Sequence, residues 1–312
     1  MRALLFPGQG SQLVGMGAEF YNNFDAVKKI FDQADEKLKY PLSKIILQGP
    51  EDQLQLTKNT QPAILTVSYS IFKILKEEFE FNFDEFNFFL GHSLGEYSAL
   101  VCSDSLKFDD AIYLLNERGK AMQEAVPVGK GKMLAVLGAE INVINELLNS
   151  IKQNNICEIA NDNANGQVIV SGNREGVDSF QSILKEKKIK CIPLKVSAPF
   201  HCSLMKPAAN KMSEKIKKTN FEKPKRNIVS NVTAKIENDK EKIKDLLIKQ
   251  IYSSVKWRES ILNISNEGVN KFIEIGPGKV LTGMVKRTIN NVNCFPINSI
   301  ADIKNLKNEF KK

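Results

Sequence analysis

Histidine is scarce in this chain: only His92 and His201 occur among its 312 residues. Two histidines exclude a histidine-rich metal centre, and any imidazole-based acid–base chemistry has only these two carriers. The five cysteines are widely spaced with no Cys-x-x-Cys pair, which gives no zinc signature and favours a reduced, intracellular protein. No apolar run approaches the ~20 residues of a membrane span, and the run before Pro7 is too short for a signal peptide. We therefore expect a cytoplasmic protein with no membrane contact and no metal.

Arginine is also scarce, with six residues, so the positive charge is almost entirely lysine. The chain has 44 basic and 36 acidic residues, a formal net charge of +8. Proteins that read nucleic acid usually use arginine forks interleaved with aromatic side chains, and no such stretch occurs here. We expect no nucleic-acid partner, whereas attraction for an acidic protein remains open.

Short apolar runs alternate with helical stretches along most of the chain. Three of the four runs end in a glycine or proline turn, and the last is followed by a helix expected over 279–289. This alternation is typical of an α/β domain with a mainly parallel sheet. The expected strands are Ala3–Phe6, Phe86–Leu90, Ile228–Val232 and Phe272–Ile275.

A middle segment differs, because its elements follow the order β-α-β-β-α-β of a ferredoxin-like unit. We therefore predict a small ferredoxin-like subdomain at residues 127–197, inserted into a larger, discontinuous domain formed by residues 1–126 and 198–312. The expected elements are strands at 132–137, 156–161, 167–171 and 189–196, and helices at 142–151 and 174–187.

Gly91-His92-Ser93-Leu94-Gly95 matches the pattern Gly-x-Ser-x-Gly. A tight strand-to-helix turn needs small neighbours so that a strained serine can project its hydroxyl, as in α/β-hydrolase-like domains. The pattern alone is weak, but an expected strand precedes it and an expected helix follows it. Ser93 is thus a candidate nucleophile; the competing interpretation is a plain structural turn.

A serine nucleophile needs a base. His92 directly precedes Ser93 at the end of an extended strand, so its side chain should point away from that of the serine. His201 is then the only sterically plausible partner, although a histidine in such a loop can also be an ordinary turn residue.

Arg118 is the third unusual residue. It lies on the apolar stripe of a helix expected over 109–125, together with Ala111, Leu115 and Met122. It either extends past the edge of the core or is held near a pocket, where its fork could grip a carboxylate with two hydrogen bonds.

Five motifs in order resemble those of malonyl-CoA:acyl carrier protein transacylases and the acyltransferase domains of fatty-acid and polyketide synthases. The resemblance covers essentially the whole chain. The motifs are Phe6–Gln12, Gly91–Tyr97, the arginine at Arg118, the histidine loop Ser197–His201, and Ile275–Gly278.

The resemblance implies roles for individual residues. Ser93 resembles the acyl-accepting nucleophile, His201 its base, and Arg118 the clamp for the free carboxylate of malonyl. The remaining implied positions are the oxyanion-hole amides of Gln9 and Leu94, the histidine-orienting backbone carbonyl of Gln250, and the pocket residues His92, Asn161, Asn163 and Phe200.

The implied reaction transfers malonyl from malonyl-CoA to the phosphopantetheine thiol of acyl carrier protein, through a malonyl-serine and with ping-pong kinetics. It supplies fatty-acid synthesis and needs no bound cofactor. We expect a monomer. A bulky residue before the histidine accompanies malonyl selection in this family, so Phe200 favours malonyl, although simple loop packing would also explain it.

The basic balance has a possible use, because acyl carrier proteins are usually acidic. Eight basic residues lie in the segment 206–226, against Glu214 and Glu222. Part of this basic segment could attract the carrier protein by long-range steering; a solvated helix face in a lysine-rich protein explains it equally well.

Three alternatives share most of these features. A serine thioesterase or esterase would use the same turn and oxyanion hole with water as the acceptor. A trans-acting acyltransferase of a polyketide synthase would perform the same chemistry for another carrier. A non-catalytic subunit that binds the carrier protein would keep the fold and only a relict, inactive site.

Overall fold

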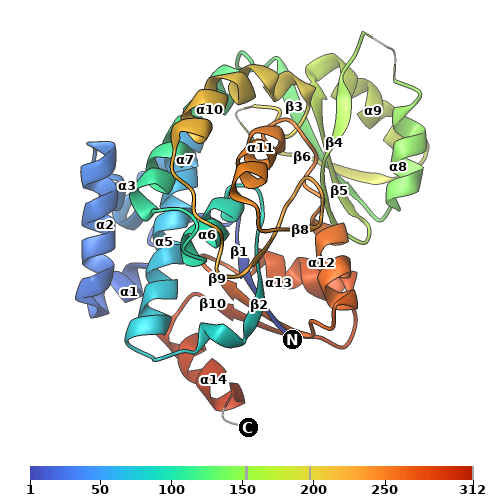
Figure 1. The fold of residues 1–312 in the computed structure, drawn as a ribbon. Helices are drawn as coiled ribbons and strands as arrows, with labels where there is room; N and C mark the ends of the chain where they lie inside the picture. Colours follow the sequence, from blue (N-terminus) through green and yellow to red (C-terminus); the bar gives the residue numbers. More distant parts are fainter. Residues whose placement is uncertain (152–153, 197, 311–312) are drawn as a thin grey trace.

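The computed structural model describes residues 1–151, 154–196 and 198–310, and Figure 1 shows their arrangement. Two sheets organise the molecule. A six-stranded sheet forms the centre of the larger part, and a four-stranded sheet forms the smaller part. No helix within these described ranges is long and apolar enough to cross a membrane.

The central sheet has the order β10-β9-β1-β2-β7-β8. All neighbouring pairs are parallel except β7 and β8. The prediction of an α/β protein with a mainly parallel sheet is therefore confirmed. The strands are β1 (Arg2–Phe6), β2 (Phe86–Gly91), β7 (Asn227–Val229), β8 (Ile236–Glu237), β9 (Lys271–Ile275) and β10 (Asn293–Ile297).

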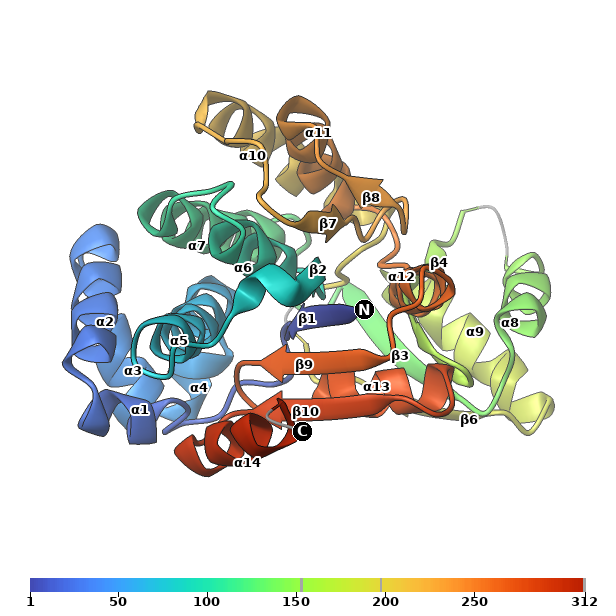
Figure 2. The same ribbon diagram turned by 60° about the horizontal axis from the view of Figure 1, so that its bottom comes forward.

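Both faces of this sheet are covered, as the apolar strands require. On β1, Leu4 and Phe6 belong to the core beneath the long helices, whereas Ala3 and Leu5 belong to a second core with Trp257. Figure 2 shows β1, β9 and β10 side by side, with α13 against them. The helices of the large part are α1 (Ala18–Asn23), α2 (Asp25–Leu38), α3 (Leu42–Gln48), α4 (Glu51–Gln55), α5 (Thr57–Glu77), α6 (Gly95–Cys102), α7 (Phe108–Glu124), α10 (Lys206–Lys218), α11 (Lys240–Gln250), α12 (Trp257–Asn266), α13 (Val280–Thr288), α14 (Ile300–Phe310) and the short η1 (Phe83–Glu85) and η2 (Ser203–Met205).

The small sheet is antiparallel, with the order β4-β5-β3-β6. Its apolar face packs against two helices around Phe180 and Leu184. The elements, in chain order, are β3 (Gly131–Leu137), α8 (Ile141–Leu148), β4 (Cys157–Ala164), β5 (Gln167–Asn173), α9 (Arg174–Glu186) and β6 (Lys190–Pro193).

Strand β4 fastens the small sheet to the large part. The Asp162 N–H donates to the Val255 carbonyl at 3.0 Å, and the Val255 N–H donates to the Ala160 carbonyl at 2.8 Å. The Arg258 Nε–H is also shared between the two oxygens of the buried Asp162 carboxylate, at 2.9 and 3.0 Å. Consequently, β4 is held at the boundary where the two parts meet.

Two expected strands are shorter than predicted. β7 ends at Val229 instead of Val232, because the Ser230 N–H donates to the Lys235 carbonyl and turns the chain toward β8. β6 ends at Pro193. The Leu194 N–H still donates to the Met133 carbonyl at 3.0 Å, but the Val196 N–H donates back to the Leu194 carbonyl at 3.1 Å, so the chain turns out of the strand over residues 194–196. Ser197, the first residue of the expected histidine loop, lies outside the described residues.

Candidate active site

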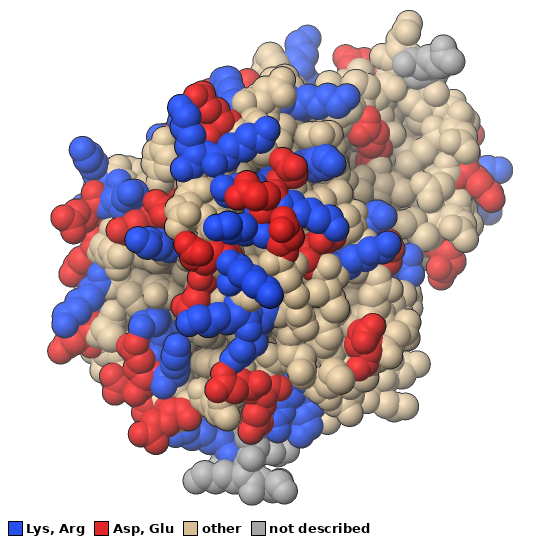
Figure 3. All heavy atoms as spheres, viewed as in Figure 1, with Lys and Arg blue, Asp and Glu red and all other residues tan. Residues whose placement is uncertain are grey.

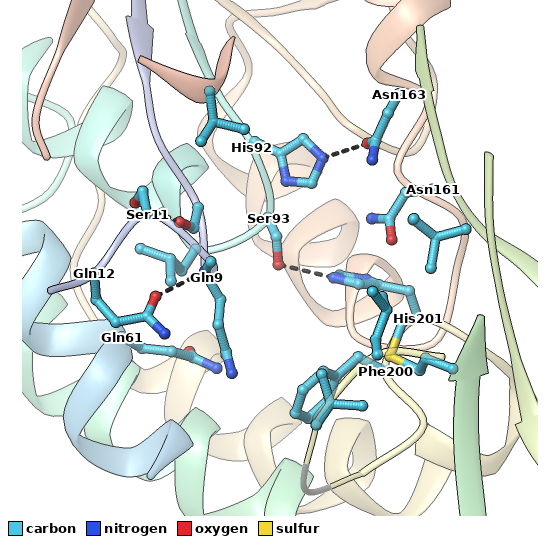
Figure 4. A pocket seen from close by; sticks show the side chains of 18 of the residues that line it. Gln9, Ser11, Gln12, Gln61, His92, Ser93, Asn161, Asn163, Phe200 and His201 are labelled. Carbon is cyan, nitrogen blue, oxygen red and sulfur yellow. Dashed lines mark hydrogen bonds between the residues drawn. The ribbon is translucent and has the colours of Figure 1, made fainter. Parts of the chain in front are cut away.

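The carboxyl ends of the parallel strands β1, β2 and β7 meet at one edge of the central sheet, where ligands of open α/β sheets usually bind. A cavity of about 400 Å³ opens there, between this edge and β4 of the small sheet. Figure 4 shows the side chains that point into it. Every residue expected at the site except Gln250 lines the cavity, namely Gln9, His92, Ser93, Leu94, Arg118, Asn161, Asn163, Phe200 and His201.

Ser93 occupies a sharp turn between β2 and α6, with the left-handed φ of 53° that is uncommon for a residue with a side chain. The turn leaves no room beside it. A Cβ on Gly91 would lie 1.8 Å from the Gly95 carbonyl carbon, and one on Gly95 would lie 2.2 Å from the Phe6 carbonyl oxygen. The two glycines of the motif are therefore a steric requirement of a turn that aims the Ser93 hydroxyl into the cavity.

Ser93 and His201 form a hydrogen-bonded pair. The distance from the serine Oγ to the His201 Nε2 is 2.8 Å, and the His201 Nδ1 lies 2.8 Å from the Gln250 backbone carbonyl oxygen (Figure 4 shows the serine contact). A carbonyl can only accept, so Nδ1 carries the proton and Nε2 presents its lone pair to the serine. This tautomer is the one that a general base needs.

The His201 imidazole is 5% exposed. Burial, with the nearby positive charge of Arg118 as a smaller cause, lowers the pKa of His201 from 6.5 to about 3. The ring is therefore neutral near pH 7 and able to accept the Ser93 proton.

His92 points away from the serine hydroxyl, as its strand position predicts. Its Nε2–H donates to the Asn163 Oδ1 at 2.8 Å, which links the end of β2 to β4 across the cavity (Figure 4). Burial lowers the pKa of His92 as well, so this ring is also neutral. His92 is placed as a bridge between the sheets, out of reach of the proton that Ser93 must lose.

Arg118 is 1% exposed and lines the cavity. Nη1 donates to the Gln61 Oε1 at 2.7 Å, and Nη2 donates to the Gln250 Oε1 at 2.9 Å and to the Ser93 Oγ at 3.1 Å. Neither amide carries charge, and no ion pair involves Arg118 within the described ranges. A buried cation beside the nucleophile whose hydrogen-bond partners are all neutral is suited to an anionic substrate group, although the buried Glu96 also interacts with its charge.

Two backbone amides are candidates for stabilising an oxyanion. The loop after β1 lies against the nucleophile turn, because a Cβ on Gly8 would be 2.5 Å from the His92 carbonyl oxygen. This contact places Gln9 beside Leu94 at the cavity wall. In the part of the chain that the structure describes, neither amide N–H donates to a protein acceptor. Both are thus available to a substrate oxygen.

Asn161 and Phe200 both line the cavity near His201, and Figure 4 shows the Asn161 amide directed toward the serine–histidine pair. Phe200 directly precedes His201, is buried and lines the same cavity as Ser93. Among the described residues no cluster of histidine, cysteine and acidic side chains could hold a metal ion.

Sequence reasoning missed three side chains that contact the expected ones: Gln61, Asn231 and Glu96. Asn231 lies near the end of the predicted strand 228–232, and in the structure it comes two residues after β7, at the carboxyl edge of the parallel part of the sheet. A polar residue at this edge is a signal that sequence reasoning could have used. Gln61 lies in α5, a long helix without a recognisable active-site pattern. Glu96 is fully buried, which raises its pKa from 4.5 to about 7, and its Oε2 accepts from Gln250 Nε2 at 2.8 Å.

A family model described as an acyl transferase domain matches residues 3–311. The chain is 45% identical to the malonyl CoA-acyl carrier protein transacylase of Bacillus subtilis, over 91% of this chain and 89% of that protein. It is 39% identical to the protein of the same name from Escherichia coli K12, over 95% of each.

Solved structures agree. An acyl-carrier-protein S-malonyltransferase from Bartonella henselae superimposes with a TM-score of 0.96 at 39% identity, covering 100% of this chain and 99% of that one. A malonyl-transacylase solved in complex with its type II polyketide-synthase acyl carrier protein gives a TM-score of 0.94 at 40% identity, covering 98% and 99%.

Proposed function

The chain belongs to the acyl transferase domain family, and on that premise we propose that it transfers malonyl from malonyl-CoA to the phosphopantetheine thiol of an acyl carrier protein. One observation carries the assignment of the chemistry to residues. A serine in a strained turn, a neutral histidine 2.8 Å away and a buried arginine with only neutral hydrogen-bond partners face one cavity. The enzyme is an acyltransferase, and the resemblance inferred from the five sequence motifs is confirmed at family level.

In the first half-reaction, the Ser93 hydroxyl gives its proton to the His201 Nε2 while its oxygen attacks the thioester carbonyl of malonyl-CoA. The carbonyl oxygen becomes an oxyanion, which the Gln9 and Leu94 N–H groups stabilise. When the carbon–sulfur bond breaks, CoA leaves with the proton from His201. Malonyl remains as an ester on Ser93.

In the second half-reaction, the thiol of the carrier protein takes the place of CoA. It gives its proton to His201 and attacks the ester carbonyl, and the same N–H groups stabilise the second oxyanion. The carbon–oxygen bond breaks, the proton returns from His201 to the Ser93 oxygen, and malonyl leaves as the new thioester. One site that serves two thiols in turn gives ping-pong kinetics, and no step uses a bound cofactor.

Arg118 is proposed to hold the free carboxylate of malonyl. Its guanidinium is fixed by Gln61 and Gln250, so its donors are preorganised before the substrate arrives. A carboxylate there would place a full negative charge against the guanidinium, whereas an acetyl group would leave Arg118 with neutral hydrogen-bond partners and only the more distant Glu96 as an acidic neighbour. Phe200 lines the cavity beside the histidine and is proposed to favour malonyl over bulkier acyl groups.

We further infer that residues 127–197 form a ferredoxin-like subdomain inserted between residues 1–126 and 198–312 of an α/β-hydrolase-like domain. The element order from β3 to β6 and the sheet order β4-β5-β3-β6 support this division. Asn161 and Asn163 come from the inserted subdomain, so the division would place the acyl pocket between two domains. His92, Asn161 and Asn163 are proposed as pocket residues, and Gln250 as the residue that orients His201.

The proposed partner is an acidic acyl carrier protein of fatty-acid synthesis. We propose that the enzyme acts on it as a monomer in the cytoplasm. Ion pairs reduce the charge that the basic segment 206–226 offers, because Lys211, Lys215, Lys218, Lys225 and Arg226 each meet an acidic side chain. Figure 3 shows this mixture of basic and acidic side chains over α10 and α11. The steering role therefore falls to the three lysines of the segment without such a partner among the described residues, Lys206, Lys217 and Lys223.

A transfer experiment tests the function. The protein is incubated with radiolabelled malonyl-CoA and separated from unbound malonyl-CoA and CoA. It is then mixed with the phosphopantetheinylated carrier protein. We expect label on the protein first and on the carrier afterwards. Release of free malonate instead would indicate a thioesterase, and absence of labelling would indicate a binding subunit; either result contradicts the proposal.

A further inference from the structure

The turn that carries Ser93 is held by side chains that the proposed reaction does not use. A left-handed backbone at a residue with a side chain is sparsely populated and persists only where its surroundings fix it. Ser93 has such a backbone, with φ of 53°, so the contacts around its peptide groups determine where the hydroxyl points.

The Asn231 side chain holds the backbone immediately before the nucleophile. Its Oδ1 accepts the Ser93 N–H at 2.7 Å, and its Nδ2 donates to the Gly91 carbonyl at 2.8 Å. The residue is 1% exposed. A single amide group therefore ties together the two peptide groups on either side of His92, immediately before the reactive side chain.

The peptide group after Ser93 is held in the same manner by Gln250. Its Nε2 donates to the Ser93 carbonyl at 3.0 Å. In a trans peptide the carbonyl and the next N–H point in opposite directions, so this contact also fixes the direction of the Leu94 N–H, a proposed oxyanion donor. The Gln250 Nε2 lies 3.3 Å from the Asn231 Oδ1, which joins the two amides.

Asn231 is itself fixed from a third direction. Its backbone N–H donates to the Glu96 Oε2 at 3.1 Å, and its carbonyl accepts the Lys256 N–H at 2.9 Å. Because its main chain is fastened on both sides, its amide cannot turn away from Ser93 without breaking buried hydrogen bonds.

We propose that Asn231 is a positioning residue for acyl transfer, which fixes the Ser93 turn so that the hydroxyl faces His201 and the Leu94 N–H faces the oxyanion. This inference rests on the proposed function, since Asn231 acts only through Ser93. Both half-reactions use the same turn, so loss of the amide slows both by a similar factor. Malonyl-CoA binding should change little, because Asn231 makes no hydrogen bond to Arg118.

The test compares Asn231→Ala with a matched control. Asn238→Ala removes an amide hydrogen bond of 2.8 Å to Asn227 at the other end of β7, away from the turn. We expect Asn231→Ala to lower the rate of Ser93 acylation and of transfer to the carrier about 100-fold, the usual cost of misplacing a reacting group by about 1 Å. Asn238→Ala should leave the acylation and transfer rates within about twofold of those of the parent, because substitutions away from the site usually have small effects.

Binding is measured separately in the Ser93→Ala background, where no chemistry occurs. The dissociation constant of malonyl-CoA should be the same with and without Asn231→Ala. A rate loss that is matched by weaker binding, or that the control variant shares, would overturn the positioning role, as would an unchanged acylation rate. Absence of acylation in the parent protein would instead contradict the proposed function.

Asn231→Asp keeps the shape and an acceptor for the Ser93 N–H but places a carboxylate oxygen against the Gly91 carbonyl oxygen, so repulsion replaces that hydrogen bond. This variant provides the test if Asn231→Ala does not fold, and we expect its rate of acylation to fall at least about tenfold. Acylation at the parent rate would overturn the proposal.

Discussion

At the residue scale, the site depends on two neutral imidazoles and one cation, all withdrawn from water. Burial is the main reason that the pKa of His201 falls to about 3, and it also lowers the pKa of His92. A buried histidine is a base near neutral pH only if it stays unprotonated, so the enclosure of the site sets the protonation state that catalysis needs.

The scarcity of histidine makes this directly measurable. An NMR titration of the imidazole nitrogens should show two histidines, neither of which titrates near pH 6.5. The unfolded chain binds a proton at His201 near pH 6.5 and the folded chain does so only near pH 3, so the free energy of unfolding should fall as the pH falls through that window. The acid limb of kcat/KM for malonyl-CoA should lie below the ordinary histidine range. A histidine signal with a midpoint near 6.5 that disappears in His201→Gln would contradict this.

Arg118 should discriminate between acyl groups. Arg118→Ala removes two charge-assisted hydrogen bonds to the malonyl carboxylate, and we expect kcat/KM for malonyl-CoA to fall roughly 1000-fold, at about 2 kcal/mol for each bond. Transfer of acetyl, which has no carboxylate, should change much less, apart from the lost contact with the Ser93 Oγ. Initial rates with both thioesters measure the ratio, and an equal fall for the two would refute the clamp.

At the element scale, helix packing determines where Arg118 lies. Gly119 in α7 has no space for a side chain, because a Cβ there would lie 2.6 Å from the Lys58 Cα and from the Thr57 carbonyl oxygen of α5. Close approach of the two helices places Arg118 beside Gln61, with 2.7 Å between Nη1 and Oε1. A glycine next to the arginine is thus part of the site although it touches no substrate.

Gly119→Ala should therefore affect both stability and selectivity. Forcing α7 away from α5 should cost about 1–3 kcal/mol in the free energy of unfolding, measured with urea. It should also lower kcat/KM for malonyl more than for acetyl, because the guanidinium shifts. Gly283→Ala is the matched control, since nothing lies within 4 Å of a Cβ there. Equal stability of the two variants would show that the helices can adjust without moving Arg118.

The sequence predicts the strand–turn–helix around Ser93 because local chemistry determines it: an apolar strand, two glycines and a following helix. It does not reveal Asn231 or Gln61 as site residues, because their roles depend on segments that meet only after β7 aligns with β2 and α5 packs on α7. Periodicity identified the face of α7 that holds Arg118, whereas its partners Gln61 and Gln250 are 57 and 132 residues away in the chain. Contacts between residues so far apart in the chain cannot be predicted from local sequence patterns.

At the scale of the whole molecule, the site lies between the central sheet and the edge strand of the small sheet. β4 contributes Asn161 and Asn163 and is fastened by the Asp162–Arg258 pair. The chain carries a net charge of +8. Much of the positive charge of the basic segment 206–226 is paired with neighbouring carboxylates.

Charge reversal tests which lysines attract the carrier protein. Replacing Lys206, Lys217 and Lys223 by Glu should lower kcat/KM for the carrier about tenfold at low salt, with a smaller effect at high salt, because long-range attraction is screened over ~10 Å at 0.1 M ionic strength. The rate of acylation by malonyl-CoA should stay unchanged. Reversal of Lys185, Lys187 and Lys188 at the end of α9 gives the same change of net charge elsewhere. Equal effects of the two triple variants would leave no specific role for the basic segment.

The most direct measurement locates the malonyl group itself. The protein is mixed briefly with malonyl-CoA, quenched in acid and digested, and the modified peptide is sequenced by mass spectrometry before and after addition of phosphopantetheinylated carrier protein. We predict one malonyl group per chain, carried on Ser93, which disappears from the enzyme as malonyl-carrier protein forms. A malonyl group on any other residue, or a malonyl-Ser93 that the carrier cannot discharge, would contradict the proposed mechanism.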